Sequence, residues 1–149
     1  GAEHPTTLAS MHSLACLLDA QNKRKEAEEL YRDTLDGFRT TLGTQHPETL
    51  ECMHQFACLL EALGKHAEAE ELSRSALQGF EVAMGAEHPD TLGCVYQLAC
   101  LLEAQGRLPE AEELLRRELV GCEAAHGVGH ANTVASARHL ARLLQARGQ

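Results

Sequence analysis

The sequence repeats itself every 42 residues, and this period limits the fold more than any other feature. The pentapeptide GAEHP at Gly1 returns at Gly85, with GTQHP between them at Gly43 and the weaker GVGHA at Gly127. The second and third blocks of 42 residues are identical at 24 positions. Periods of this length are typical of stacked repeats, in which each unit buries its apolar side only against its neighbours. We therefore expect a linear array of similar units.

The period divides the chain into three full units and one half unit. The full units cover residues 1–42, 43–84 and 85–126, and the half unit covers 127–149. Because stability in such an array comes from the units and the interfaces between them, we predict that residues 1–149 form a single domain.

Each full unit is predicted to contain two helices. Over residues 5–20, apolar residues recur at steps of three and four, which is typical of an amphipathic helix, and a proline occupies the first turn. We call this helix and its equivalents the A helices, and we expect each to end at Asn22 or at its glycine counterparts, which tolerate left-handed backbone. A second helix, the B helix, is predicted from about residue 25 to 42. The whole chain is then all-α, with seven helices and an unpaired final A helix.

The repeated pentapeptide is predicted to join one helix pair to the next. Its glycine ends a B helix and its proline starts the following A helix. The recurring histidines at 4, 46, 88 and 130 are interpreted as hydrogen-bonding loop anchors, because no second metal ligand accompanies them. Glycines also recur inside the B helices, at 37, 79 and 121, where they cost up to about 1 kcal/mol each. Their recurrence predicts a close backbone approach.

Small and charged residues recur in register as well. Alanines at 15, 57, 99 and 141 on the A helices, and at 27, 69 and 111 on the B helices, are predicted where helices touch closely. Paired glutamates recur on the B helices at 28 and 29, 70 and 71, and 112 and 113. We interpret these pairs as a solvated helix face.

Charge and cysteine content favour a cytoplasmic protein that binds other proteins. The 13 basic and 22 acidic residues give a formal net charge of −9, which disfavours nucleic acid and anionic membranes as partners. We expect partners that are neutral or partly basic. Five of the six cysteines fall at repeat-equivalent positions, where stacked helices are roughly 8–10 Å apart and too distant for disulfides. The thiols are predicted to be reduced, with no membrane span and no signal peptide.

The segment HPETLECMHQFACLLEALGKHAEAEELSRSAL resembles the tetratricopeptide repeat, in the 42-residue version with an HP-containing loop that kinesin light chains carry. The similarity extends over the whole chain: the Leu14–Ala15 pair, Leu18, the turn glycine, the EAE segment and Leu35 are all in register. It implies antiparallel helix pairs stacked as a right-handed superhelix (an α-solenoid), whose A helices line a concave groove for a peptide or protein.

The resemblance also implies which residues face a partner. In the first two units they are His12, Ser13, Cys16, Asp19, His54, Gln55, Cys58 and Glu61. In the third unit and the half unit they are Tyr96, Gln97, Cys100, Glu103, Arg138, His139 and Arg142. This face is polar and acidic over its first three helices and basic on the last, so complementary charges would set the direction of a bound peptide.

Two alternatives to partner binding arise from the same residues. His12 with Cys16, and His54 with Cys58, are four residues apart and project from one helix face, and zinc prefers imidazole with thiolate. The other alternative is self-association: the half unit lacks its own B helix, so Leu140, Ala141 and Leu144 would lose cover and could join a second chain.

The sequence predicts no enzyme and no cofactor. It contains no strained glycine elbow, no phosphate-cradling loop and no acid and base pair with distinct environments. A non-enzymatic scaffold is therefore the function that the sequence favours.

Overall fold

The computed structural model describes residues 5–148, and these form seven helices and no strand. The predicted all-α fold is therefore confirmed. The helices are α1 (Pro5–Ala20), α2 (Arg24–Thr41), α3 (Pro47–Ala62), α4 (His66–Met84), α5 (Pro89–Ala104), α6 (Leu108–His126) and α7 (Ala131–Ala146). The first A helix has the predicted bounds, and the first B helix begins and ends one residue earlier than expected. None of these helices is long and apolar enough to cross a membrane.

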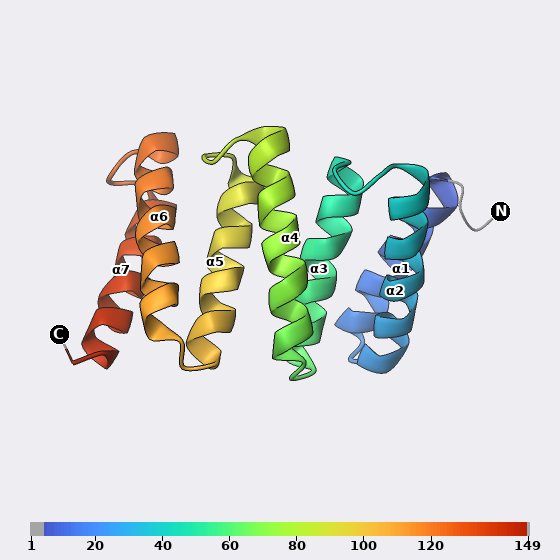
Figure 1. The fold of residues 1–149 in the computed structure, drawn as a ribbon, viewed down its shortest axis with the longest axis horizontal. Coiled ribbons are helices and arrows are strands. Elements are labelled where there is room, and N and C mark those ends of the chain that lie inside the picture. The colour runs from blue at the N-terminus through green and yellow to red at the C-terminus, as the bar shows by residue number, and fades with distance from the viewer. Residues whose placement is uncertain (1–4, 149) are drawn as a thin grey trace. The chain divides into compact units, whose positions relative to one another are not determined.

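The helices form two compact units that divide between Gly79 and Phe80, within α4. We call these two the first unit and the second unit, and we call the 42-residue segments of the sequence repeats. In the first unit, α1 packs against α2 and α2 against α3. In the second unit, α5 packs against α6 and α6 against α7, and consecutive helices run in opposite directions (Figure 1). The inclusion of both units in one domain stays a prediction.

Left-handed backbone ends the helices where the sequence predicted it. Asn22 ends the first A helix with φ of 64°, and the equivalent glycines at 64, 106 and 148 have φ of 81°, 77° and 80°. The loop glycines after the B helices, at 43, 85 and 127, have φ of 90°, 93° and 89°. A residue with a Cβ is strained in this region, which explains why glycine recurs at these points.

The loop histidines anchor the starts of the A helices. His46, His88 and His130 have extended backbone, and the Nδ1 atom of each accepts a hydrogen bond from the backbone N–H two residues later, at 3.2, 3.1 and 3.1 Å. Each ring thus satisfies one N–H that the helix leaves unpaired. The predicted anchoring role is confirmed for these three, and His4 lies outside the described residues.

Leucines from the A helices fill the space beside the B-helix glycines. A Cβ added to Gly37 would lie 2.4 Å from Cδ2 of Leu8, and one added to Gly79 would lie 2.3 Å from Cδ2 of Leu50. The same atom pair at Gly121 and Leu92 would be 2.6 Å apart. The predicted close approach is confirmed, and the neighbour is a leucine side chain.

Alanines occupy the other helix contacts. Those predicted at 15, 57 and 99 on the A helices, and at 27, 69 and 111 on the B helices, are all 0% exposed. The exception is Ala141, which is exposed on α7. The same residue type at the same repeat position is therefore buried only where a B helix follows.

The described ends of the array leave apolar side chains uncovered. Leu14 and Leu17 on α1 are 49% and 53% exposed. At the other end Leu144 is half-buried, but Leu140 is only 6% exposed. The prediction that Leu140 lacks cover is wrong, because α7 packs against α6 and buries the near side of its apolar stripe. Self-association through the remaining exposed residues stays a prediction.

The paired glutamates do not form one uniformly solvated face. The second of each pair, at 29, 71 and 113, is exposed. Side chains of the first, at 28, 70 and 112, are only 12%, 15% and 17% exposed, and each pairs with the arginine four residues later. Glu28 also binds Lys65 at 2.6 Å, and this contact lowers the pKa of the carboxyl. The interpretation as a solvated face is therefore wrong for half of these residues.

Candidate functional site

Several predicted partner-binding residues of the first unit line one hollow of about 370 Å³. It lies between α1 and α3, and Tyr31 of α2, only 2% exposed, forms its floor. We call it the first hollow. Its lining residues are Cys16, Asp19, Tyr31, Glu51, His54, Gln55 and Cys58.

Hydrogen bonds within the first hollow converge on the amide of Gln55. Its Oε1 accepts from Cys16 Sγ at 2.8 Å and from the Tyr31 hydroxyl at 3.4 Å, and it lies 3.3 Å from His12 Nε2. Its Nε2 donates to Glu51 Oε1 at 2.9 Å. Burial and the neighbouring Cys16 raise the pKa of Tyr31, so its hydroxyl stays a neutral donor. The hollow therefore presents a polar surface already organised by its own residues.

The His and Cys residues of this region do not assemble into a metal centre. Among residues 5–148, no three or more His, Cys, Asp and Glu side chains are grouped so that they could hold a metal ion. His12 and Cys16 both contact Gln55 instead.

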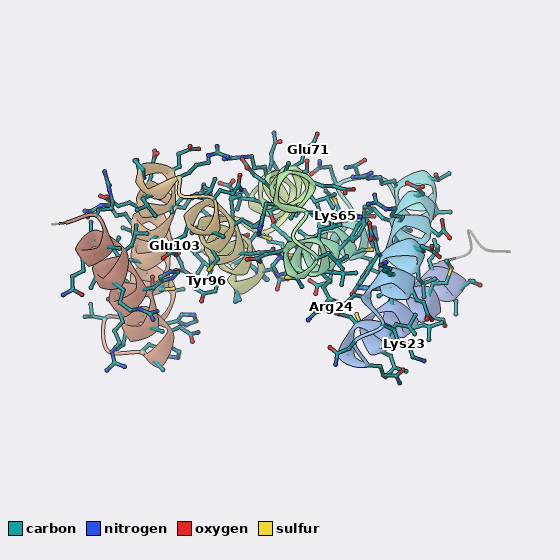
Figure 2. All side chains as sticks on the ribbon, turned by 90° about the horizontal axis from the view of Figure 1, so that it is seen from below. Lys23, Arg24, Lys65, Glu71, Tyr96 and Glu103 are labelled. Atoms are coloured by element: carbon teal, nitrogen blue, oxygen red, sulfur yellow. The ribbon has the colours of Figure 1, made fainter. Side chains whose placement is uncertain are left out.

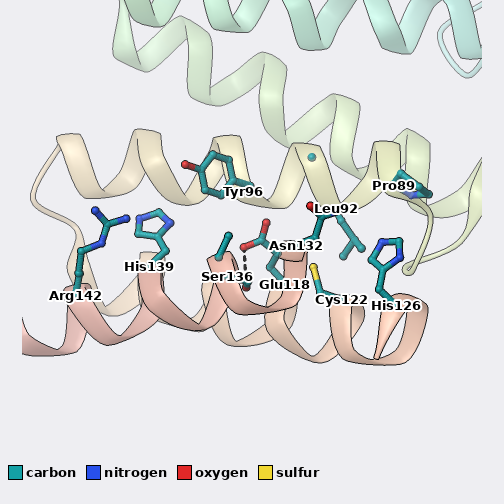
Figure 3. Close-up of a pocket in the computed structure, with 12 residues that line it drawn as sticks. Pro89, Leu92, Tyr96, Glu118, Cys122, His126, Asn132, Ser136, His139 and Arg142 are labelled. Atoms are coloured by element: carbon teal, nitrogen blue, oxygen red, sulfur yellow. Dashed lines mark hydrogen bonds between the residues drawn. The ribbon is translucent and has the colours of Figure 1, made fainter. Parts of the chain in front are cut away.

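A second hollow, of about 390 Å³, lies between α5 and α7 of the second unit, with α6 beneath (Figure 3). Its floor contains Glu118, and its walls carry apolar, aromatic and basic side chains. The lining residues are Pro89, Leu92, Gly93, Tyr96, Glu118, Cys122, His126, Asn132, Ala135, Ser136, His139 and Arg142.

The electrostatics of the second hollow centre on Glu118. This carboxylate is 8% exposed and accepts a hydrogen bond from Ser136 Oγ at 3.0 Å. Burial raises its pKa, against smaller lowering effects of the Ser136 bond and of His139. His139 turns its Nε2 to Glu103 Oε1, at 2.9 Å, and its ring lies edge-on to Tyr96 with centroids 5.3 Å apart. Glu118 therefore makes a hydrogen bond to Ser136 but no ion pair with any described residue.

The structure places the predicted site residues in three environments. His12, Cys16, Asp19, His54, Gln55, Glu61, Cys100 and Glu103 are half-buried, whereas Ser13, Cys58, Tyr96, Arg138 and Arg142 are exposed. Gln97 and His139 are buried, at 6% and 7% exposure. Tyr96 and Glu103 both project from α5 (Figure 2). The first hollow gathers five of the predicted residues and the second gathers Tyr96, His139 and Arg142.

The floors of both hollows come from B helices, which the sequence reasoning did not consider. Tyr31 and Glu118 were both missed for this reason. The sequence does contain one indication for Glu118. Its equivalents in the first two repeats are the small residues Thr34 and Ala76, so the third repeat has a long acidic side chain at a position that is otherwise small.

Replacing Glu118 with glutamine is expected to stabilise the protein at neutral pH. Because the folded state raises the pKa of this carboxyl, stability is highest while the group is protonated and falls as pH rises from the unfolded-state pKa through the folded one. Glutamine can still accept the Ser136 hydrogen bond and carries no charge. We expect a gain of about 1 kcal/mol, or roughly 2–4 °C in Tm, at pH 7.

Thermal unfolding followed by circular dichroism from pH 4 to pH 8 measures this effect. The gain must shrink as the pH falls. Glu123→Gln, which removes an exposed carboxylate from the same helix, serves as the matched control. A gain that is equal at all pH values would contradict the assignment.

Comparison with known proteins identifies the family. The tetratricopeptide repeat family matches residues 25–81 and, in the next register, residues 59–119. The chain belongs to the tetratricopeptide repeat family. No curated protein sequence matches it at a significant level.

Solved structures agree with this tetratricopeptide repeat assignment. The crystal structure of nearly identical TPR-like repeats from Podosopora anserina, a protein assigned as a kinesin light chain, matches with a TM-score of 0.90 and 34% identity, over 100% of this chain and 71% of that one. A single-substitution variant of those repeats gives a TM-score of 0.91, also at 34% identity, over 100% and 70% of the two chains. BtubC (BKLC) from P. vanneervenii matches with a TM-score of 0.74 at 16% identity, over 95% and 65% of the two chains, and shows the fold alone.

Proposed function

We propose that this tetratricopeptide repeat chain is a non-enzymatic, cytoplasmic scaffold that binds a peptide or protein partner across the exposed faces of its A helices. The two hollows are the parts of these faces best shaped to take side chains of the partner. The net charge of −9 favours a partner that is neutral or partly basic. None of the six cysteines forms a disulfide in the structure, which is consistent with a reducing compartment.

One observation supports this proposal above the others. Repeat-equivalent residues of the second A helix line the hollow in each unit: Glu51, Gln55 and Cys58 in the first correspond to Ala135, His139 and Arg142 in the second. A hollow therefore recurs at the equivalent place in both units, whereas the side chains that line it differ in size and charge. Such variation on a constant frame is what recognition of a non-repetitive partner needs, because a specific complex depends on local complementarity.

Selection from a phage-displayed library of random peptides tests the proposal without knowledge of the natural partner. We expect an enriched consensus, whose synthetic peptide binds in isothermal titration calorimetry. A variant that carries both Glu61→Lys and Glu103→Lys reverses one charge on an A helix of each unit, and it should bind this peptide about tenfold more weakly.

The matched control carries Glu29→Lys and Glu113→Lys. It makes the same change in charge at exposed positions on B helices, and it should bind like the unaltered chain. Failure to enrich any consensus, or equal binding by both variants, would count against the A-helix faces as the binding surface.

A further inference from the structure

The second hollow contains a buried carboxyl group that makes no ion pair with any described residue. Glu118 is 8% exposed, and its one hydrogen-bond partner among the described residues is the neutral hydroxyl of Ser136. A buried carboxylate without a cation is costly, because its loss of hydration is not repaid. Such a group in a solvent-accessible hollow is suited to meet its counter-charge on a ligand.

His139 and Arg142, two of the three basic residues that line this hollow, make no ion pair with Glu118. His139 directs Nε2 to Glu103 and leaves its buried Nδ1 without a hydrogen-bond partner. Arg142 is exposed and lies beyond His139 at one end of the hollow, whereas Glu118 stands near the middle, beside Ser136 (Figure 3). No ion pair joins Arg142 to Glu118 in the described part of the chain. The centre of the hollow therefore holds a carboxyl group without an ion-pair partner, and the guanidinium of Arg142 stands at its end.

The walls around Glu118 suit a long cationic side chain. Tyr96 is 47% exposed and offers its ring to the hollow, where an aromatic face attracts an ammonium or guanidinium group. Leu92 lines the same space and provides apolar contact for a methylene stem. A volume of about 390 Å³ admits one side chain and part of a peptide backbone.

We propose that the second hollow is a subsite for a lysine or arginine side chain of the partner, with the Glu118 carboxylate as its counter-charge and Tyr96 as an aromatic wall. This inference rests on the proposed function and specifies which partner residue the second unit selects. Arginine is the better fit of the two, because its planar guanidinium can bind a carboxylate through two hydrogen bonds while it stacks on a ring.

Nuclear magnetic resonance titration with small probes tests the subsite apart from any peptide partner. The probes are Nα-acetyl-arginine methylamide, its lysine analogue and the uncharged norleucine analogue. We expect saturable shifts of the Tyr96 and Ser136 resonances with the two cationic probes. Because a hydrogen bond to a charged group is worth about 1.5–3 kcal/mol, Glu118→Gln should weaken arginine-probe binding by about 10- to 100-fold.

Two further variants separate this role from a general effect of charge or of folding. Glu123→Gln removes an exposed carboxylate of the same helix and should leave binding unchanged. Tyr96→Leu alters an exposed wall residue that the fold does not need buried, and it should weaken binding about two- to fivefold. The three variants should keep the helical circular dichroism spectrum of the unaltered chain.

The inference is overturned if the cationic probes cause no saturable shift, if the norleucine probe binds equally well, or if Glu118→Gln binds the arginine probe like the unaltered chain. These results do not contradict the proposed function, provided that library peptides still bind the unaltered chain and bind the double lysine variant more weakly. Failure of the peptide selection alongside saturable, Glu118-dependent probe binding would instead reject the proposed function and show a cation site without a peptide groove.

Discussion

Leu59→Ala is expected to destabilise the protein by about 2–5 kcal/mol, the usual cost of truncating a fully buried leucine. Leu59 lies on α3 and is 1% exposed. Its repeat equivalents Leu101 and Leu143 are both 0% exposed, so this position is buried in every repeat after the first. The loss therefore combines lost burial with a cavity at an interface between repeats.

The same substitution at Leu17 provides the matched control. Leu17 has the same residue type at the same repeat position, but on α1, the first described helix, it is 53% exposed. Leu17→Ala should cost about 1 kcal/mol or less, because half of the side chain already meets water. Urea unfolding followed by circular dichroism measures both variants. A stacked architecture requires that burial between neighbouring repeats determines stability. Equal losses in the two variants would contradict this.

The 42-residue period allowed most of the fold to be predicted, because glycine and proline fix backbone geometry locally. The bounds of the first A helix, the left-handed residues from Asn22 onward and the capping role of His46 all depend on residues close in sequence. Leu140 was predicted wrongly for the opposite reason. Its burial depends on which side of α7 meets α6, and that is decided by packing rather than by the repeat pattern.

The candidate site was less predictable, since its floor comes from a different helix than its walls. The family resemblance places Cys16 and Tyr96 on the partner-facing side of the A helices, but it does not show that Tyr31 and Glu118 line the same hollows from the B helices. The last repeat also differs at a core position. The other repeats have a leucine there that contacts a B-helix glycine, whereas the last repeat, which has no B helix, has Val134, and this side chain is 37% exposed.

Gly79→Ala is expected to destabilise the protein by about 1–2 kcal/mol, although alanine is the better helix former. Helix propensity favours the change by up to about 1 kcal/mol. Against it, the new Cβ would lie 2.3 Å from Cδ2 and 3.1 Å from Cδ1 of Leu50, a leucine that is 0% exposed. Overpacking of this kind costs typically about 1–3 kcal/mol and occasionally more, so it outweighs the propensity.

Gly93→Ala should have the opposite sign and serves as the matched control. Gly93 lies inside α5, and a Cβ added there would meet no atom within 4 Å, so only the propensity gain of up to about 1 kcal/mol remains. Combining Gly79→Ala with Leu50→Ala should cost less than the sum of the two single changes, because the shortened side chain makes room for the new methyl group. The explanation would be contradicted if the losses in unfolding free energy were strictly additive, or if Gly79→Ala were as stable as Gly93→Ala. Contact with the A-helix leucines would then not be the reason that glycine recurs at these positions.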